Sequence, residues 1–256
     1  MLSTDVQVRE AQQLVIDVFK SLRSDLLSVY GNIEHTRKGD SSPVTVWDVK
    51  VEETLRAALE QAYPEIGFEG EETGEWGNRE TYWLVDPIDG TSSFIRGLPF
   101  CTNMAALVDK GHVIAAVIYD FVNDVLYTAL KDQGAFKNGE PIHVNTTRGP
   151  GNQVVYSLTR QAFGHLQEAM HELGIRLILP MGAAGYDYAL LAEGKIDGVI
   201  VVNTQTGLYD NAPGLLLAEE AGAVMLQYDN EVGVQRHEFI VGAPSVVERI
   251  EHSGLI

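Results

Sequence analysis

Two carboxylates, Asp86 and Asp89, lie three residues apart directly after the apolar run Trp83–Val85. The run predicts a buried strand, and the residues after it predict a sharp turn. Carboxylates that converge at a strand end suit a hard cation such as Mg²⁺, which takes a few carboxylate oxygens and keeps several waters. The backbone carbonyl of Ile88, between the two aspartates, is a candidate third oxygen ligand.

Gly90, Thr91 and Ser92 follow where a helix could begin, so that their N–H groups would point outward and could bind a phosphate. The alternative for this segment is a plain turn, because Asp-Pro and Asp-Gly are common turn dipeptides. Either dipeptide alone favours the turn. The complete string from Trp83 to Thr91 favours a site for a cation and a phosphate.

Two further acidic segments could face the same cation. Glu71 or Glu72, in Gly70–Thr73, would approach it from the end of a neighbouring strand, and the alternative is a solvated acidic loop. Asp210 lies at the start of an apolar helix, where its simplest role is that of a helix N-cap.

The elements that must position these residues follow from hydrophobic periodicity and turn signals. Apolar residues at helical spacing predict helices over 4–29, capped by Thr4, and over 47–62. From residue 66 the pattern predicts strands at 66–69, 82–86, 104–108, 112–120 and 125–129, and Asn138-Gly139 predicts a tight hairpin. After residue 150 strands and helices alternate, as in an α/β layer: strands 153–158, 175–179, 197–202, 223–227 and 238–241, and helices 162–173, 183–193, 211–221 and 244–252. We therefore expect an N-terminal α+β part, 1–145, and a C-terminal α/β part, 146–256, packed as one body.

Composition narrows the function classes. The 256 residues include 18 Lys and Arg against 36 Asp and Glu, a net charge of −18 that would repel nucleic acids and anionic membranes. The single cysteine, Cys101, allows neither an internal disulfide framework nor a cysteine-based zinc site, and a buried structural thiol is expected. No basic and apolar leader opens the sequence, and no apolar run approaches the roughly 20 residues that cross a bilayer. A cytoplasmic protein is expected.

Several segments together resemble the inositol monophosphatase family of Mg²⁺-dependent, lithium-sensitive phosphatases. The family pattern D-P-[IL]-D-G-T-x-N-F matches residues 86–94, except that Ser93 stands where asparagine is usual. Its other elements match Gly70–Thr73, Gly134–Val144 and Gly182–Gly185, and its C-terminal element matches Asp210, Ala212 and Gly214, with Tyr209 in place of tryptophan and Pro213 in place of a small residue. The matches occur in the family's order, which argues against a chance origin.

The resemblance implies a layered α-β-α-β-α sandwich of the sugar phosphatase type, with metal ions where its two parts meet. It implies that Glu71 and Asp86, with the Ile88 carbonyl, bind one Mg²⁺, and that Asp86, Asp89 and Asp210 bind a second. A third, weaker ion would be shared by Glu71. A homodimer is the usual state of the family.

The resemblance also assigns the groups around the phosphate. Thr91, oriented by Asp48, would position or deprotonate the water that attacks phosphorus, and the amides of Gly90 and Thr91, with Ser92 beside them, would bind the phosphate. Five carboxylates at one site repel one another strongly unless cations neutralise them, and those cations would attract a phosphate despite the net charge of the protein.

We expect a phosphomonoesterase acting on inositol 1-phosphate or a related small phosphate ester. Asn203 stands where inositol phosphatases carry a glutamate that binds sugar hydroxyls, and Ala184 would line the leaving-group side. Only Lys195 is basic within 180–214, which argues mildly against bisphosphates. The alternatives are a histidinol-phosphate phosphatase, a fructose 1,6-bisphosphate or 3′,5′-bisphosphonucleotide phosphatase, and a non-catalytic metal-binding relative.

Overall fold

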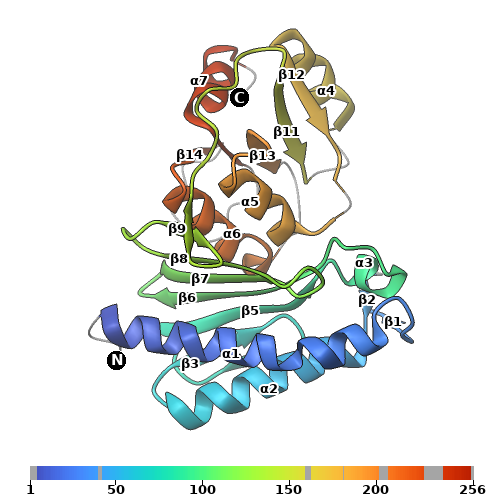
Figure 1. The fold of residues 1–256 in the computed structure, drawn as a ribbon, viewed down its shortest axis with the longest axis vertical. Helices are drawn as coiled ribbons and strands as arrows, with labels where there is room; N and C mark the ends of the chain where they lie inside the picture. The colour runs from blue at the N-terminus through green and yellow to red at the C-terminus, as the bar shows by residue number, and fades with distance from the viewer. Residues whose placement is uncertain are drawn as a thin grey trace.

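The protein is built from five alternating layers of helices and sheets (Figure 1). The structure, a computed structural model, describes residues 5–39, 42–158, 163–180, 182–201, 207–227 and 239–254. In Figure 1, α1 and α2 form one outer layer, an eight-stranded sheet follows, α5 and α6 lie in the middle, and a five-stranded sheet with α4 and α7 completes the stack. The expected α-β-α-β-α sandwich is therefore confirmed. No helix in the described ranges has both the length and the apolar character needed to cross a bilayer.

The larger, eight-stranded sheet carries Asp86, Ile88 and Asp89 of the candidate site. Its strand order is β10-β9-β8-β7-β6-β5-β3-β4, and all pairs are antiparallel except β3 with β5. The strands are β3 (Gly67–Gly70), β4 (Gly74–Trp76), β5 (Thr81–Asp89), β6 (Thr102–Asp109), β7 (His112–Asp120), β8 (Val125–Leu130), β9 (Ala135–Lys137) and β10 (Glu140–Ile142). Every residue of β5 is buried, because both faces of the sheet are covered by helices.

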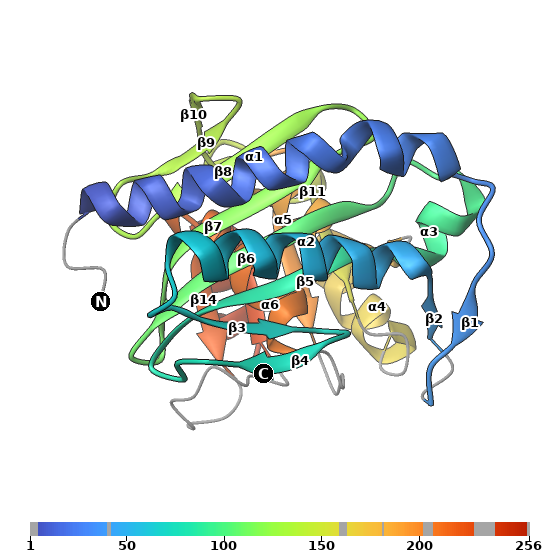
Figure 2. The ribbon, with the colours of Figure 1, turned by 90° about the horizontal axis from the view of Figure 1, so that it is seen from below.

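Helices α1 (Asp5–Val29) and α2 (Val46–Ala62) run side by side across one face of this sheet (Figure 2). The apolar stripe of α1 is buried as its spacing predicts, through Val15, Phe19 and Leu26. The stripe of α2 departs from the prediction. The helical spacing predicts an apolar stripe of Trp47, Val51, Leu55, Ala58 and Ala62. The helix instead buries Asp48, Val51, Glu52, Leu55 and Leu59, and Ala62 is exposed.

The middle layer is formed by α5 (Ala184–Ala192) and α6 (Leu208–Glu220), which pack between the two sheets. The second sheet has the order β12-β11-β13-β15-β14, in which β11 is parallel to β12 and β13. On its outer face lie α4 (Phe163–Glu172) and α7 (Pro244–His252). Its strands are β11 (Gln153–Ser157), β12 (Ile175–Ile178), β13 (Gly198–Val201), β14 (Val224–Gln227) and β15 (Phe239–Gly242).

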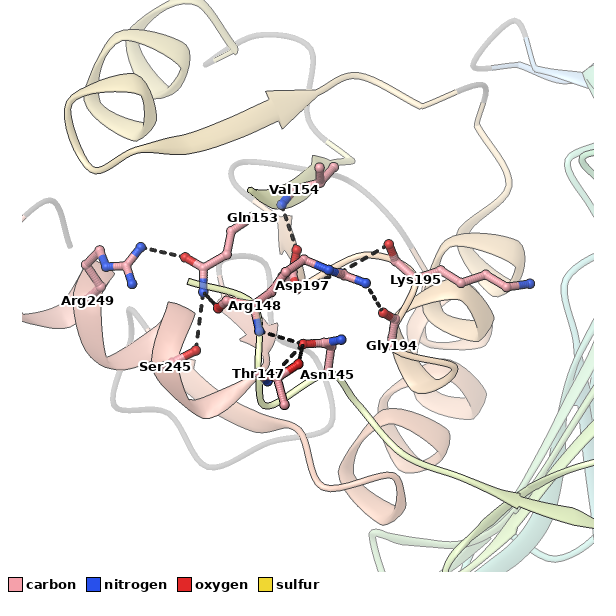
Figure 3. Close-up of polar contacts among 10 residues, drawn as sticks. All are labelled: Asn145, Thr147, Arg148, Gln153, Val154, Gly194, Lys195, Asp197, Ser245 and Arg249. Atoms are coloured by element: carbon pink, nitrogen blue, oxygen red, sulfur yellow. Dashed lines mark hydrogen bonds and ion pairs between the residues drawn. The ribbon is translucent and has the colours of Figure 1, made fainter. Parts of the chain in front are cut away.

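The segment that connects the two sheets is fixed by a polar network (Figure 3). Arg148 donates to Asp197 Oδ1 at 2.8 Å and to the Gly194 carbonyl at 2.6 Å. The other oxygen of Asp197 accepts from the Val154 amide at 2.7 Å. Gln153 adds a bond from its side-chain amide to the Arg148 carbonyl at 2.8 Å. The chain therefore enters the second sheet in a single, hydrogen-bonded conformation.

The predicted elements are present with boundaries within a few residues, and 112–120 and 244–252 are reproduced as predicted. Asn138-Gly139 forms the β9–β10 hairpin, with positive φ at both residues. The helix expected to begin at Gly90–Ser92 is α3 (Thr91–Arg96). Two features were not predicted: strand β4, and the short pair β1 (Thr36–Arg37) and β2 (Pro43–Val44), which lies in the polar segment 31–45 that the sequence predicts to be a surface loop. Thr4 lies outside the described residues. The division at residue 145 stays a prediction.

Candidate active site

A β-bulge places Asp86 and Asp89 on the same face of the sheet. Asp86 pairs with Met104 and Asp89 pairs with Thr102, so three residue steps on β5 oppose two on β6. In a regular strand, residues three apart point to opposite faces, and the extra residue of the bulge corrects this. Asn103 supports the irregular backbone, because its side-chain amide donates to the carbonyl of the residue after Asp86 at 2.6 Å.

Gly90 turns the chain from β5 into α3. Its φ of 81° is the left-handed conformation that glycine adopts without strain, and a Cβ here would also overlap the Phe100 carbonyl. Thr91 and Ser92 are the first two residues of α3, so their amides have no partner within the helix. The expected helix start is therefore present. The Ser92 carbonyl accepts a bond from Arg96 at 2.7 Å.

Thr91 is held by two acceptors. Its hydroxyl oxygen lies 3.2 Å from Asp48 Oδ1 and 3.0 Å from the Ile88 carbonyl oxygen. Asp48, the third residue of α2, is itself fixed because Oδ2 accepts from the Thr45 amide at 2.8 Å and the Thr45 hydroxyl at 2.6 Å. The structure thus joins Asp48 on α2 to Ile88 at the end of β5 and Thr91 at the start of α3.

Glu71 lies directly after β3 and forms an ion pair with Lys38. The ammonium nitrogen lies 2.6 Å from Glu71 Oε1 and also contacts Glu72. Burial alone would lower the pKa of Lys38, but these two carboxylates outweigh burial and raise the pKa. Lys38 precedes Asp48 in a loop for which the sequence leaves two interpretations open, closure over the metals or a solvated lysine, and these contacts assign it to the site.

Asp89 connects the large sheet to the middle layer. Its oxygens accept from the amides of Ala184 at 3.0 Å and Gly185 at 2.8 Å, the first two residues of α5. The Thr102 hydroxyl donates to the same carboxylate at 3.1 Å. Ala184, expected on the leaving-group side, thus contacts Asp89 through its backbone.

Asp210 comes from the first turn of α6, but it is not the N-cap. The helix begins three residues earlier than expected, and Asp210 Oδ2 accepts from the Gly207 amide at 2.6 Å. Pro213 lies inside the helix, where it cannot donate to the carbonyl of Tyr209. Burial and then the charges of Glu71 and Asp210 raise the pKa of Tyr209, so its hydroxyl lies in the field of the site.

The carboxylates of the site disfavour one another's ionisation. Burial, followed by the charges of Glu71 and Asp89, raises the pKa of Asp86 well above its ordinary value. Burial raises the pKa of Asp89 to about 6 although the amides of α5 oppose it, and burial with the charge of Asp89 raises the pKa of Asp210 to about 7. Burial also raises the pKa of Asp48. These four aspartates and Glu71 therefore form one electrostatic unit.

The donor chemistry of this unit fits a divalent cation. Among the described residues Asp86 Oδ1, which is buried, has no hydrogen-bond partner, and buried polar atoms of this kind need an explanation. In the described part of the chain, no three His, Cys, Asp or Glu side chains are arranged as a ready metal cage. Glu71 instead forms an ion pair with Lys38, and Asp210 accepts a hydrogen bond from a backbone amide. Binding of an ion would exchange these partners.

Two buried carboxyl groups near the site are not apparent from local motifs. Glu52 lies one turn after Asp48 on α2 and is fully buried; an acidic residue inside an apolar helix stripe is the signal for it. Asp187, on the first turn of α5, is 4% exposed, and its Oδ2 has no hydrogen-bond partner in the part of the chain that the structure describes. Cys101 is buried, as expected, and burial raises the pKa of its thiol. Asn203 lies outside the described residues.

Comparison with known proteins agrees with the geometry. The model of the inositol monophosphatase family matches residues 4–255. Inositol-1-monophosphatase of Rhizobium meliloti is 35% identical over 218 residues, which cover 82% of this chain and 81% of that protein. Nus factor SuhB of Vibrio cholerae is 26% identical over 267 aligned positions, covering 98% and 96%. The crystal structure of extragenic suppressor protein suhB from Bartonella henselae superposes with a TM-score of 0.81 at 29% identity, covering 95% and 98% of the two chains. The chain belongs to the inositol monophosphatase family of phosphomonoesterases.

Proposed function

We propose that the protein is a Mg²⁺-dependent phosphomonoesterase that hydrolyses inositol 1-phosphate or a related small phosphate ester. The observation that carries this proposal is the convergence of Asp48, Glu71, Asp86, Asp89 and Asp210 around the start of α3, with one buried Asp86 oxygen unpaired. So many buried carboxylates in mutual electrostatic contact favour cations as their partners.

Glu71, Asp86, the Ile88 carbonyl, Asp89 and Asp210 would hold the ions. Bound Mg²⁺ lowers the pKa of water and neutralises the charge of the phosphoryl and leaving oxygens. Two ions, with a third weaker one at Glu71, follow from the resemblance and remain part of the proposal.

The chain's own contribution is to hold the attacking water and the phosphate. Thr91 can accept a hydrogen bond from the water while its own proton goes to Asp48 Oδ1 at 3.2 Å. As the oxygen–phosphorus bond forms, one water proton can pass through Thr91 to Asp48, whose pKa is raised by burial. The ester bond breaks, its oxygen takes up a proton from solvent to leave as the alcohol, and Asp48 returns its proton to solvent. The amides of Gly90 and Thr91, with Ser92 beside them, would bind the phosphoryl oxygens at the start of α3.

The inositol 1-phosphate assignment is supported by the relative from Rhizobium meliloti, whose name gives that activity. Histidinol phosphate, fructose 1,6-bisphosphate and 3′,5′-adenosine bisphosphate are the competing esters. Phosphate release from the four compounds, measured with Mg²⁺ and with EDTA, tests the proposal. We expect turnover only with Mg²⁺ and a wide margin for inositol 1-phosphate. A wide margin for another ester would replace the substrate, and turnover that persists in EDTA would refute the metal dependence.

Two substitutions test the residue roles. Asp89→Asn and Asp210→Asn each keep the size of the side chain and remove one charge, so turnover should nearly vanish while the far-UV circular dichroism spectrum stays unchanged. Asp17→Asn, on the exposed side of α1, is the matched control. Turnover within tenfold of wild type for both site variants would remove the two-metal assignment.

Three further expectations belong to the proposal: inhibition by lithium, a homodimeric state, and a cytoplasmic location without nucleic-acid or membrane partners. Insensitivity to lithium at high millimolar concentration would count against close functional kinship with the family. Sedimentation equilibrium tests the dimer.

A further inference from the structure

Glu52 is a buried carboxylate whose hydrogen bonds all go to one loop. It lies on α2, one turn after Asp48, and its side chain is fully buried. Oε1 accepts from the Glu72 amide at 2.8 Å, and Oε2 accepts from the Thr73 amide at 2.8 Å and the Thr73 hydroxyl at 2.7 Å. Within the described ranges no Lys, Arg or His forms an ion pair with it. A buried carboxylate without a cation is costly unless hydrogen bonds satisfy it, so these bonds define its role.

These bonds fix the backbone on one side of Glu71. On the other side, the Glu71 amide donates to the Val85 carbonyl at 3.2 Å, which holds the loop against β5. Gly70, the last residue of β3, leaves the space that Glu52 fills, because a Cβ at Gly70 would overlap the Glu52 carboxylate. The backbone at Glu71 is therefore held on one side by its bond to β5 and on the other by the bonds to Glu52. Its side chain, by contrast, can change partners.

The helix that carries Glu52 also carries Asp48. The two residues are four apart, so they lie on the same face of α2, one reaching Thr91 and the other reaching the loop of Glu71. A single helix thus sets the distance between the hydroxyl at Thr91 and the backbone at Glu71, from which the Glu71 carboxylate extends. Lys38 contacts Glu71 from a separate segment and does not touch Glu52.

We propose that Glu52 is a positioning residue that sets the direction of the Glu71 carboxylate and thereby the affinity of the site for its divalent cation. The proposal rests on the proposed function, because it takes Glu71 as an ion ligand. Glu52 itself does not bind the ion or the substrate. When a residue that orients a metal ligand without binding the metal itself is replaced, metal affinity typically changes by about 10- to 100-fold.

The test is Glu52→Gln, which keeps the shape but replaces one acceptor oxygen by a donor that faces a backbone amide. Binding of Mn²⁺ to the purified full chain, followed by electron paramagnetic resonance, gives a readout that does not depend on catalysis. We expect the dissociation constant to rise at least tenfold. The half-saturating Mg²⁺ concentration for phosphate release should rise in parallel, with kcat at saturating Mg²⁺ within about threefold of wild type. Glu53→Gln, the exposed neighbour on the same helix, should change neither value.

An unchanged Mn²⁺ dissociation constant in folded Glu52→Gln overturns the proposal, and so does a loss of kcat that saturating Mg²⁺ does not restore. If Glu52→Gln does not fold, Thr73→Val carries the test, since it removes one of the three hydrogen bonds and keeps the backbone amide. At least threefold weaker Mn²⁺ binding supports the proposal, and unchanged binding overturns it. Failure of the wild type to bind Mn²⁺ or to release phosphate would instead refute the proposed function.

Discussion

Asp187 should make the stability of the protein depend on pH in a way that one substitution removes. Burial, with a contribution from the charge of Asp89, raises the pKa of Asp187 from 3.8 to about 8. Tyr156, Tyr186 and Tyr188 are the neighbouring titratable groups that sense its charge, and all three are neutral below pH 9 because burial raises their pKa values. The carboxyl group is therefore protonated in the folded protein at neutral pH and ionised in the unfolded chain.

The sign and size of this pH dependence follow from proton linkage. Below about pH 4 Asp187 is protonated in both the folded and the unfolded state, so it adds no pH dependence to the free energy of unfolding. Between about pH 4 and pH 8 only the unfolded chain loses the proton, so the free energy of unfolding falls by about 1.4 kcal/mol per pH unit. Above about pH 8 both states are ionised, and the loss is constant at about 6 kcal/mol. Asp187→Asn removes the titration and keeps the size of the side chain.

The assay is urea unfolding of wild type and Asp187→Asn from pH 5 to pH 9 in EDTA, followed by circular dichroism. We expect the variant's stability relative to wild type to rise by about 4 kcal/mol over this range and to level off above about pH 8. Asp17→Asn, on the exposed face of α1, should give a flat difference. Parallel stability curves for wild type and Asp187→Asn would refute the reasoning, because they would mean that folding does not perturb the pKa of Asp187.

Three further predictions concern packing, the connecting segment and the carboxylate unit. Gly214→Ala should lower the free energy of unfolding by about 2 kcal/mol in urea titrations, because a Cβ at Gly214 overlaps the buried ring of Tyr188; an unchanged value would mean that the ring can move aside. Asp197→Ala should lower the free energy of unfolding by about 3 kcal/mol in the same assay. Asp197 is fully buried, and its removal takes a partner from the Arg148 guanidinium and from the Val154 amide. A decrease below about 1 kcal/mol would contradict this. Binding of Mg²⁺ at pH 6.5 should release at least about one proton, because the pKa values of Asp89 and Asp210 are raised to about 6 and about 7 and that of Asp86 is raised well above its ordinary value, and the release should be smaller at pH 9. Isothermal titration in two buffers of different ionisation enthalpy measures the release, and equal heats in both buffers at pH 6.5 would exclude it.

Local sequence patterns predict most of the elements because their causes are local. The apolar stripe of α1 and the Asn138-Gly139 turn need only a few neighbouring residues. The α2 stripe was predicted only in part, because Glu52 is an acidic residue that packs inward. Its partners, the amides of Glu72 and Thr73, lie some twenty residues away along the chain, and a contact of that range leaves no periodic signal.

The candidate site shows the same limit. The string from Asp86 to Thr91 identifies the residues, but it does not show that Asp86 and Asp89 share a face. That depends on a bulge, and the bulge depends on the register with β6 and on Asn103. Likewise the contact of Asp89 with the first amides of α5 joins residues about 95 apart, so only the folded chain reveals it.

Asp48 and Asp210 each hold the start of a helix, and this bears on how the protein can evolve. Each is the third residue of its helix and accepts from the amide three residues before it, at 2.8 Å from Thr45 and at 2.6 Å from Gly207. Active-site residues are often replaced with a gain in stability, because function and stability compete there. Here replacement by alanine also removes the hydrogen bond that the N-cap amide donates to the aspartate, at about 1 kcal/mol each. A lineage that loses hydrolysis would therefore keep a side-chain acceptor at both positions, and inactive descendants are expected to carry asparagine or serine there rather than alanine.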